Sequence, residues 1–271
     1  MKKSLLLITV ILLILAAYFI FPFYWLVISA TKNVGQLLQK SLLPGVPNHF
    51  LENVRMIFSY ENGVFFKWLG NSFLYATIGA FAGIFIAAMA GFAFRRYDFW
   101  GKKILFITIL GFAMVPGYAT TLPFFMIFKN LQLLNTRLAV LLPSFTNIFA
   151  VYLMVTYWNQ VSQEIFDAAE IDGATDLRIF FKMGLPNIIP GFITLFLLGF
   201  VGIWNNFFLP LVLLNSRAKM PLILGITTIT DPQGFPVYNL TLTTSFFTIL
   251  PLLIIFISMQ KFFKPQLYTH L

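Results

Sequence analysis

The chain has 271 residues, of which 59% are hydrophobic and only 10% are charged, and its formal net charge is +9. About a quarter of the residues of a soluble domain are usually charged, so this composition and a mean hydropathy of +0.86 exclude an ordinary soluble protein and predict an integral membrane protein. The absence of cysteine excludes disulfides, thiolate metal sites and cysteine nucleophiles.

Six apolar stretches are long enough to span a bilayer as helices, which takes about 20 mostly apolar residues. In chain order they are residues 4–30, 68–94, 104–128, 138–158, 187–214 and 242–260. The first follows Lys2 and Lys3 but is too long for a secretory signal, whose apolar region has about 7 to 15 residues. We therefore expect an all-α integral membrane protein with six transmembrane helices in a single domain, residues 1–271.

Several prolines fall inside these stretches. They are Pro22, Pro116, Pro123, Pro210 and Pro251. Because neighbouring helices can satisfy the carbonyl groups that a proline frees, these residues predict kinks and not breaks.

The basic residues set the expected orientation. The segment RRYDFWGKK (95–103) has four basic residues in nine, whereas the loop after the first stretch spreads its lysines and arginines thinly from Lys32 to Lys67. Cytoplasmic loops are enriched in Lys and Arg, so this density predicts that both termini are cytoplasmic. The scattered basic loops also account for the positive charge without a nucleic-acid partner.

Two outer segments have patterns of their own. PNHFLENVRMIF predicts a short helix capped by Asn48, with Phe50, Val54 and Phe58 near one face. GITTITDPQGFPVYNL (225–240) is rich in Gly, Pro and Thr and predicts a structured loop.

Several kinds of chemistry are missing from the sequence. No phosphate-binding GxxxxGKS motif is present, so we expect the chain to bind no ATP through such a loop. The only histidines, His49 and His270, are far from any predicted cluster, so we expect no metal site and no catalytic residue. No predicted span carries an acidic residue, which disfavours an ion-coupled secondary carrier. An enzyme acting on lipid-linked sugars would need paired carboxylates or a histidine cluster at the membrane face, and the sequence shows neither. A secondary carrier and such an enzyme are kept as the two alternative functions.

The stretch EIFDAAEIDGATDLRIFF (164–181) holds five of the nine acidic residues of the chain. Ser162 can cap a first helix that ends at Asp172 and Gly173, and Thr175 can cap a second helix that runs to about Met183. One interpretation is a solvated cytoplasmic loop. The other is a docking element, because small residues at a bend let backbones approach closely and charges fix the orientation.

The sequence DAAEIDG, followed ten residues after its glycine by MGLP, resembles the signature (EAA) loop of permease subunits of bacterial and archaeal ATP-binding-cassette (ABC) importers. The family pattern is E-A-A, three residues, G, nine residues, then I-x-L-P; Asp167 stands where the family usually has Glu, and Met183 where it usually has Ile. The resemblance covers nearly the whole chain and is closest to carbohydrate permeases of the maltose type. It includes NSFLYATIGAFAGIFIAAMAGFAFRRYDFWGKK, LLNTRLAVLLPSF and GIWNNFFLPLVL, whereas the C-terminal FFKPQLYTH departs from the family tail.

The resemblance implies a transport subunit and not an enzyme, placed in the cytoplasmic membrane of a bacterium or archaeon. It implies that residues 162–186 form a coupling-helix loop that docks into an ATPase subunit. The docking residues would be Asp167, Ala168, Ala169, Glu170, Asp172, Gly173 and Ala174. The partners would be a second, different permease subunit, two ATPase subunits that hold ATP and Mg, and an extracytoplasmic sugar-binding protein. This chain would hold no cofactor.

Polar residues in the spans are candidates for a substrate pathway. An indole face beside amide groups suits a sugar, which points to Trp204, Asn205 and Asn206, with Asn71 and Asn147 as weaker candidates. The alternative for each asparagine is a hydrogen bond between helices. In the outer loop, the projection formed by Asp231, Pro232, Gln233 and Gly234 is expected to contact the binding protein.

Overall fold

The computed structural model describes residues 2–39 and 41–259, so the predictions that concern His270 and the C-terminal FFKPQLYTH lie outside the described residues. Within the described part, the chain is helical, with one isolated β-bridge between Thr230 and Pro236. The predicted single domain divides into two compact units. The first contains the described residues up to Lys67 and Leu222–Leu253, and the second contains Trp68–Pro221 and the described residues 254–259.

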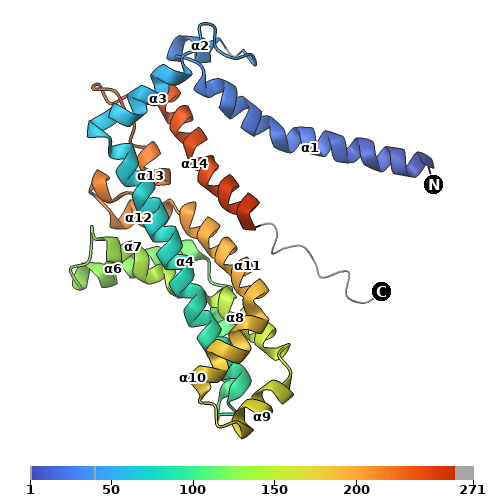
Figure 1. Ribbon diagram of the computed structural model, residues 1–271. Coiled ribbons are helices and arrows are strands. Elements are labelled where there is room, and N and C mark those ends of the chain that lie inside the picture. Colours follow the sequence, from blue (N-terminus) through green and yellow to red (C-terminus); the bar gives the residue numbers. More distant parts are fainter. Residues whose placement is uncertain (1, 40, 260–271) are drawn as a thin grey trace. The chain divides into compact units, whose positions relative to one another are not determined.

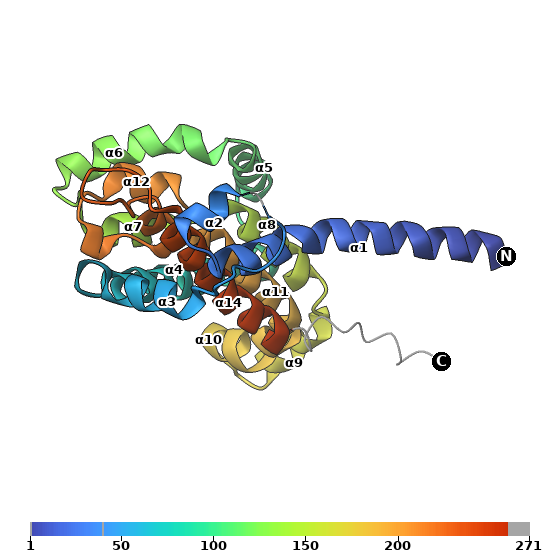
Figure 2. The ribbon, with the colours of Figure 1, turned by 90° about the horizontal axis from the view of Figure 1, so that it is seen from above.

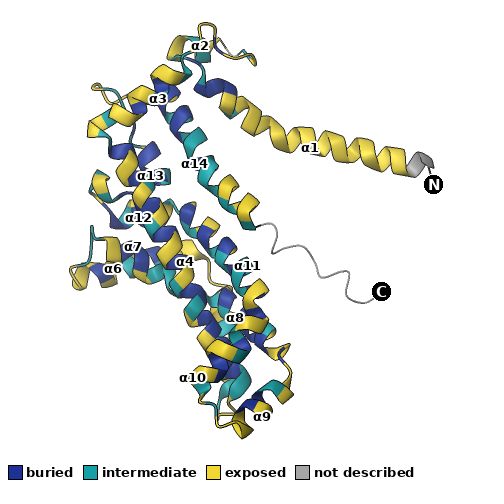
Figure 3. Cartoon of the chain, viewed as in Figure 1, coloured by how far each residue is buried: buried dark blue, intermediate teal, exposed yellow. Residues whose placement is uncertain are grey.

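The first unit contains the two segments that are predicted to lie on the outer side. Its elements are α1 (Lys2–Ala30), α2 (Val34–Leu38), α3 (Phe50–Ser59), η1 (Tyr60–Asn62), the start of α4 (Val64–Arg96), α13 (Leu222–Ile226) and most of α14 (Tyr238–Met259). From Leu5 to Trp25, α1 is exposed on every face (Figure 3). A helix that is apolar all round requires hydrocarbon or protein around it, as a membrane span does.

Buried amides hold the end of α1. The Nδ2 of Asn53 in α3 donates to the carbonyl oxygens of Ala30 at 3.0 Å and Lys32 at 2.9 Å, and the Nδ2 of Asn239 in α14 donates to the Oδ1 of Asn53 at 2.7 Å. The predicted helix after Asn48 is present, but its N-cap residue is His49 and not Asn48. The Oδ1 of Asn48 accepts a hydrogen bond from the Phe50 amide at 2.8 Å.

The second unit contains the acidic stretch. After the main part of α4, its elements are α5 (Lys102–Ala113), η2 (Gly117–Thr120), α6 (Thr121–Asn130), α7 (Arg137–Ser144), α8 (Ile148–Asn159), α9 (Gln163–Ile171), α10 (Asp176–Arg178), η3 (Ile179–Gly184), α11 (Leu185–Trp204), α12 (Phe208–Leu213) and η4 (Arg217–Lys219). Figure 1 shows α9 and α10 at one end of this unit, where α4 and α8 also end.

An aromatic core lies beneath the acidic stretch. The buried Trp158 of α8 packs on Phe92 of α4 and Phe180 of η3, with ring centroids 5.1 and 5.6 Å apart, and its indole N–H donates to the carbonyl oxygen of Ala88 at 2.9 Å. Phe166 of α9 joins the same buried cluster. The acidic stretch is therefore seated on the core that joins α4 to α8.

The third predicted span, 104–128, is broken. The helices Lys102–Ala113 and Gly117–Asn130 are bent by 97°, and Figure 2 shows α5 nearly along its axis while α6 is seen from the side. Pro116 lies in the break, so the predicted simple kink is wrong at this position: proline supplies no N–H to continue the helix, and the ring disfavours helical geometry in the residue before it.

Two other spans also contain breaks. Asn147 interrupts residues 138–158 by capping α8, where its Oδ1 accepts a hydrogen bond from the Ala150 amide at 2.9 Å, and the stretch 187–214 ends as a continuous helix at Trp204. By length and composition, five helical segments can cross a membrane in the described part, or six if the bent pair forms one span.

Candidate functional site

The bend inside the acidic stretch forms as predicted. Helix α9 ends at Ile171 with Asp172 as its C-cap, and Gly173 takes the left-handed conformation at φ +66. The amide of Gly173 donates to the carbonyl oxygen of Glu170, and the amide of Ala174 to that of Ala169, both at 2.9 Å. This pair of bonds is a Schellman motif, which fixes the direction in which the chain leaves α9. Ser162 and Thr175 occupy the predicted N-cap positions, although neither side chain makes a capping hydrogen bond.

The second helix of the stretch does not end near Met183. It runs from α10 through a π-helical turn, η3, into α11, so the acidic stretch continues into the fifth span. Gly184 lies against the ring of Trp158 and stays in the right-handed region, and a side chain there would collide with that ring. The bend is therefore joined to α11 by a continuous helix, Asp176–Trp204.

Arg96, the last residue of α4, connects both helices of the acidic stretch. Its guanidinium forms an ion pair with Glu170 of α9, and its Nε donates to the Oδ1 of Asp176 of α10 at 3.2 Å. The Tyr97 hydroxyl donates to the Oδ2 of the same aspartate at 2.6 Å, and this hydrogen bond raises the pKa of Tyr97. We call Arg96, Tyr97, Glu170 and Asp176 the clamp.

The neighbouring Arg95 reinforces this attachment. Its guanidinium carbon lies 5.3 Å from the centroid of the Phe166 ring, and its Nη2 donates to the carbonyl oxygen of Val161 at 3.3 Å. The end of α4 thus contacts the beginning, middle and end of the acidic stretch, so the bend is held as a rigid body against α4.

Burial divides the predicted docking residues into two groups. Asp167, Ala168, Asp172 and Gly173 are exposed, and Ala174 is half-buried. Ala169 is only 1% exposed because it lies on the inner face of α9 with Phe166, so it packs inside the chain.

Two of the acidic residues serve the chain itself. Glu170 and Asp176 form ion pairs with Arg96 of the same chain.

Sequence reasoning missed two exposed aliphatic side chains beside the bend. Ile171 is 87% exposed and Leu177 is 72% exposed, one on each side of Gly173. The helical periodicity could have indicated that Ile171 is exposed. A helix turns about 100° per residue, so Ile171 lies about 200° from Ala169 and therefore opposite the inner face.

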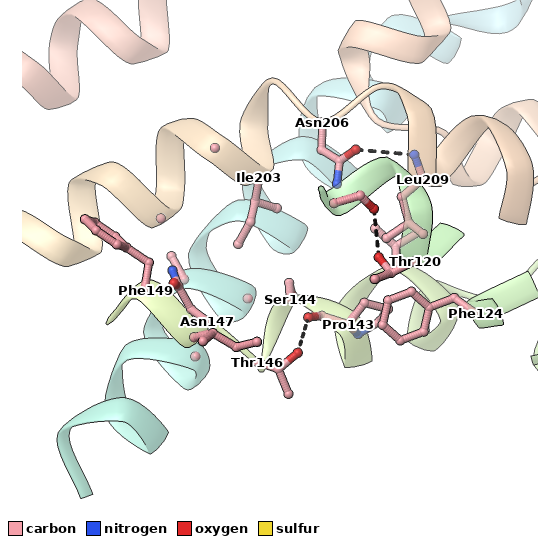
Figure 4. Close-up of a pocket in the computed structure, with 18 of the residues that line it drawn as sticks. Thr120, Phe124, Pro143, Ser144, Thr146, Asn147, Phe149, Ile203, Asn206 and Leu209 are labelled. Carbon is pink, nitrogen blue, oxygen red and sulfur yellow. Dashed lines mark hydrogen bonds between the residues drawn. The ribbon is translucent and has the colours of Figure 1, made fainter. Parts of the chain in front are cut away.

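A pocket of about 750 Å³ lies in the second unit between α4, η2, α7, α8, α11 and α12 (Figure 4). Its wall is mostly apolar, with hydroxyl and amide groups from Thr120, Ser144, Thr146, Asn147 and Asn206. The Oδ1 of Asn206 accepts a hydrogen bond from the Leu209 amide at 3.4 Å, and that of Asn147 caps α8. Among the described residues neither side-chain amide nitrogen has a hydrogen-bond partner, so both remain able to donate to a ligand.

The structure brings only Asn147 and Asn206 of the predicted pathway residues to this pocket. Trp204 is 1% exposed and stacks on Phe200 with ring centroids 5.6 Å apart, so it is a core residue. Asn71 is buried and donates to the carbonyl oxygens of Ala218 and Met220, which is the alternative role of a hydrogen bond between segments. Asn205 is exposed and does not line the pocket.

The predicted outer loop contains a tight turn built by Asp231. Its Oδ1 accepts hydrogen bonds from the amides of Gln233 at 3.0 Å and Phe235 at 2.8 Å. Pro232, Gln233 and Gly234 are exposed, and Phe235 is 68% exposed at the tip. The first unit therefore presents a shaped projection with one aromatic side chain.

The sequence of the chain matches a known family. Residues 79–267 match the family described as "Binding-protein-dependent transport system inner membrane component". The chain is 33% identical over 246 residues to the arabinooligosaccharides transport system permease protein AraQ of Halalkalibacterium halodurans, covering 90% of this chain and 88% of that protein. It is 30% identical over 256 residues to AraQ of Bacillus subtilis, covering 94% and 91%.

A solved structure shares the fold. It is that of a bacterial ABC transporter involved in the import of the acidic polysaccharide alginate, with a TM-score of 0.84, 24% identity and coverage of 97% of both chains. The helical membrane fold predicted from the sequence is confirmed. The family membership rules out the two alternatives, a secondary carrier and an enzyme acting on lipid-linked sugars. The chain belongs to the family of binding-protein-dependent transport system inner membrane components and is the membrane-spanning permease subunit of an ABC importer.

Proposed function

We propose that this permease carries a sugar, an oligosaccharide or a similar solute, handed over by an extracytoplasmic binding protein. Relatives are described as permeases for arabinooligosaccharides, for lactose in Rhizobium radiobacter and for diacetylchitobiose in Streptomyces coelicolor. The pocket supports this substrate class, because apolar walls suit the CH faces of a sugar while Asn147 and Asn206 offer donors for its hydroxyls.

We propose the following assembly for the importer. This chain pairs with a second, different permease subunit and with two ATPase subunits, which hold ATP and Mg, while the chain itself holds no cofactor. Closure of the ATPase subunits moves the docked bend, and the clamp and η3 transmit the movement to α4 and α11.

We propose that both termini lie on the cytoplasmic side of a bacterial or archaeal cell membrane. The density of basic residues in segment 95–103 supports this orientation. The clamp adds support, because contacts from Arg96 to Glu170 and Asp176 require segment 95–103 and the acidic stretch to lie on the same side.

We propose that the bend in residues 162–186 is the ATPase docking site. The observation that carries this proposal is the pair of exposed aliphatic side chains, Ile171 and Leu177, on either side of a rigid left-handed turn. Large apolar side chains on a water-facing loop are costly unless a partner covers them, and buried anchors supply most of the energy of an interface. The exposed Asp167, Asp172 and Gly173 would complete the contact.

Replacing Ile171 or Leu177 with aspartate is expected to release the ATPase subunit. Loss of an interface anchor costs about 2 kcal/mol or more, which is roughly a 30-fold loss of affinity. The measurement is the amount of ATPase that co-purifies with the permease, together with substrate uptake. Leu38→Asp is the matched control, because Leu38 in α2 of the first unit is also exposed, at 74%. Parent-level co-purification of both loop variants would refute the docking site.

Asp231→Ala is expected to weaken stimulation of ATP hydrolysis by the loaded binding protein. The substitution removes the acceptor of two backbone hydrogen bonds, each worth about 0.5–1.5 kcal/mol, and so unfolds the turn that presents Phe235. We expect an apparent affinity for the binding protein that is roughly 5- to 150-fold lower. Asp231→Asn keeps the acceptor and is expected to behave like the parent. Normal stimulation of the alanine variant would show that this turn contacts no binding protein.

A further inference from the structure

A second pocket of the second unit opens where α4 ends and α5 begins. It is open to the outside, has a volume of about 920 Å³, and is lined by the ends of α4 and α5, by the loop between them and by α8. Three basic side chains, Arg95, Lys102 and Lys103, line it together with a single acid, Asp98.

The charges in this pocket are not balanced. The Nζ of Lys102 donates to the Oδ1 of Asp98 at 2.8 Å, and this hydrogen bond lowers the pKa of Asp98, so the carboxylate is ionised and neutralises one lysine. Lys103 is exposed and has no acceptor among the described residues. Arg95 faces a ring and a carbonyl, neither of which cancels its charge, and its buried Nε lacks a partner in the described part.

The start of α5 adds to the positive potential. This helix has 12 residues, and no side chain caps it at Gly101. The amide of Lys102 donates to the carbonyl oxygen of Phe99 at 3.2 Å. The other amides of the first turn and the helix dipole attract an anion to this end of α5, where Lys103 also lies.

The rest of the pocket has an apolar part, beside the polar side chains of Thr156 and Asn159. Ile104, Phe106, Tyr152 and Val155 line it along α5 and α8, and Trp100 beside it is 98% exposed. Aromatic side chains of this kind are common at the level of lipid head groups. A free anion would use only the charged end, whereas a ligand with an anionic head and an acyl chain would use both ends.

We propose that this pocket binds an anionic phospholipid, with its phosphodiester between Arg95, Lys103 and the start of α5 and an acyl chain along Ile104 and Phe106. Placing the lipid in the cytoplasmic leaflet rests on the proposed orientation of the chain. The lipid binding itself goes beyond the transport function and requires no ATPase contact.

Native mass spectrometry of the assembled importer, permease with ATPase subunits, tests the proposal. The complex is titrated with phosphatidylglycerol, with phosphatidylcholine as the neutral lipid and with inorganic phosphate as the anion without a tail. Lys103→Gln is expected to weaken the binding of the first phosphatidylglycerol molecule about 5-fold, because one basic residue near an anionic lipid contributes about 1 kcal/mol. Asp98→Asn is expected to have the opposite effect and tighten it, because it frees the charge of Lys102. Lys129→Gln, on an exposed lysine at the end of α6, is the matched control and should bind as the parent does.

Phosphatidylglycerol binding that is the same for Lys103→Gln as for the parent would overturn the proposal, and so would weaker binding by Asp98→Asn. Displacement of the lipid by inorganic phosphate at equal concentration would identify a phosphate site and equally refute the lipid. The mass of the complex reports ATPase assembly in the same spectrum. A lipid lost from an intact complex therefore tests this site separately from the docking proposal.

Discussion

Arg96→Glu is expected to reduce transport to near background while leaving the permease inserted in the membrane. The parent guanidinium bridges Glu170 and Asp176, and glutamate would place a third carboxylate between them. A charge-assisted hydrogen bond contributes about 1.5–3 kcal/mol, and we expect the lower end because the two carboxylate side chains are 50% and 45% exposed. Losing both of these interactions of Arg96 would lower the ratio of molecules with the bend attached to α4 to those with it detached roughly 100-fold. The measurements are substrate uptake, ATPase co-purification and the amount of permease in the membrane.

Three variants control the effect of Arg96→Glu. Arg55→Glu makes the same charge change at an exposed position of α3 and should transport normally. Arg96→Lys keeps the charge but loses the forked geometry, and should fall between the parent and the glutamate variant. Tyr97→Phe removes only the hydrogen bond to Asp176 and should have the mildest effect. Full transport by Arg96→Glu would contradict the role of the clamp.

Gly173→Trp is expected to separate the permease from its ATPase. A residue with a Cβ in the left-handed conformation costs about 1–2 kcal/mol, and the indole would cover the exposed tip of the bend between Ile171 and Leu177. Nothing lies within 4 Å of a Cβ at this position, so the substitution causes no collision inside the chain. The readouts are ATPase co-purification and uptake.

Gly173→Asn is the matched control for the tryptophan variant. Asparagine tolerates the left-handed region and adds little bulk, so it should assemble and transport almost as the parent does. A loop that only faces solvent would tolerate both changes, because surface substitutions usually alter stability by under about 0.5 kcal/mol. Equal, normal assembly of both variants would therefore favour a solvated loop over a docking element.

The features that depend on neighbouring residues were predictable from the sequence. The turn at Asp172 and Gly173 forms because glycine takes the left-handed conformation after a helix without a steric penalty. The tight turn at Asp231 likewise uses an acceptor and donors that are two and four residues apart. Local chemistry determines such turns, so tertiary packing is not required to identify them.

The features that join distant residues were not predictable. Arg96 meets Glu170 and Asp176 across 74 and 80 residues of sequence, and no local pattern indicates that pairing. Trp204 is predicted as a pathway residue because an indole face beside amide groups suits a sugar, and no local pattern indicates that its ring stacks on Phe200 in the core.

Chemical cross-linking from the bend to the ATPase subunit tests the docking site most directly. The chain has no cysteine, so a single introduced thiol reports one position. Asp172→Cys, next to the left-handed turn, is compared with Leu38→Cys in α2, each in an importer that retains uptake. We predict that a short bifunctional reagent joins the Asp172→Cys permease to the ATPase subunit and leaves the Leu38→Cys permease unlinked. An active importer in which Asp172→Cys gives no ATPase adduct, while Leu38→Cys does, would contradict the account.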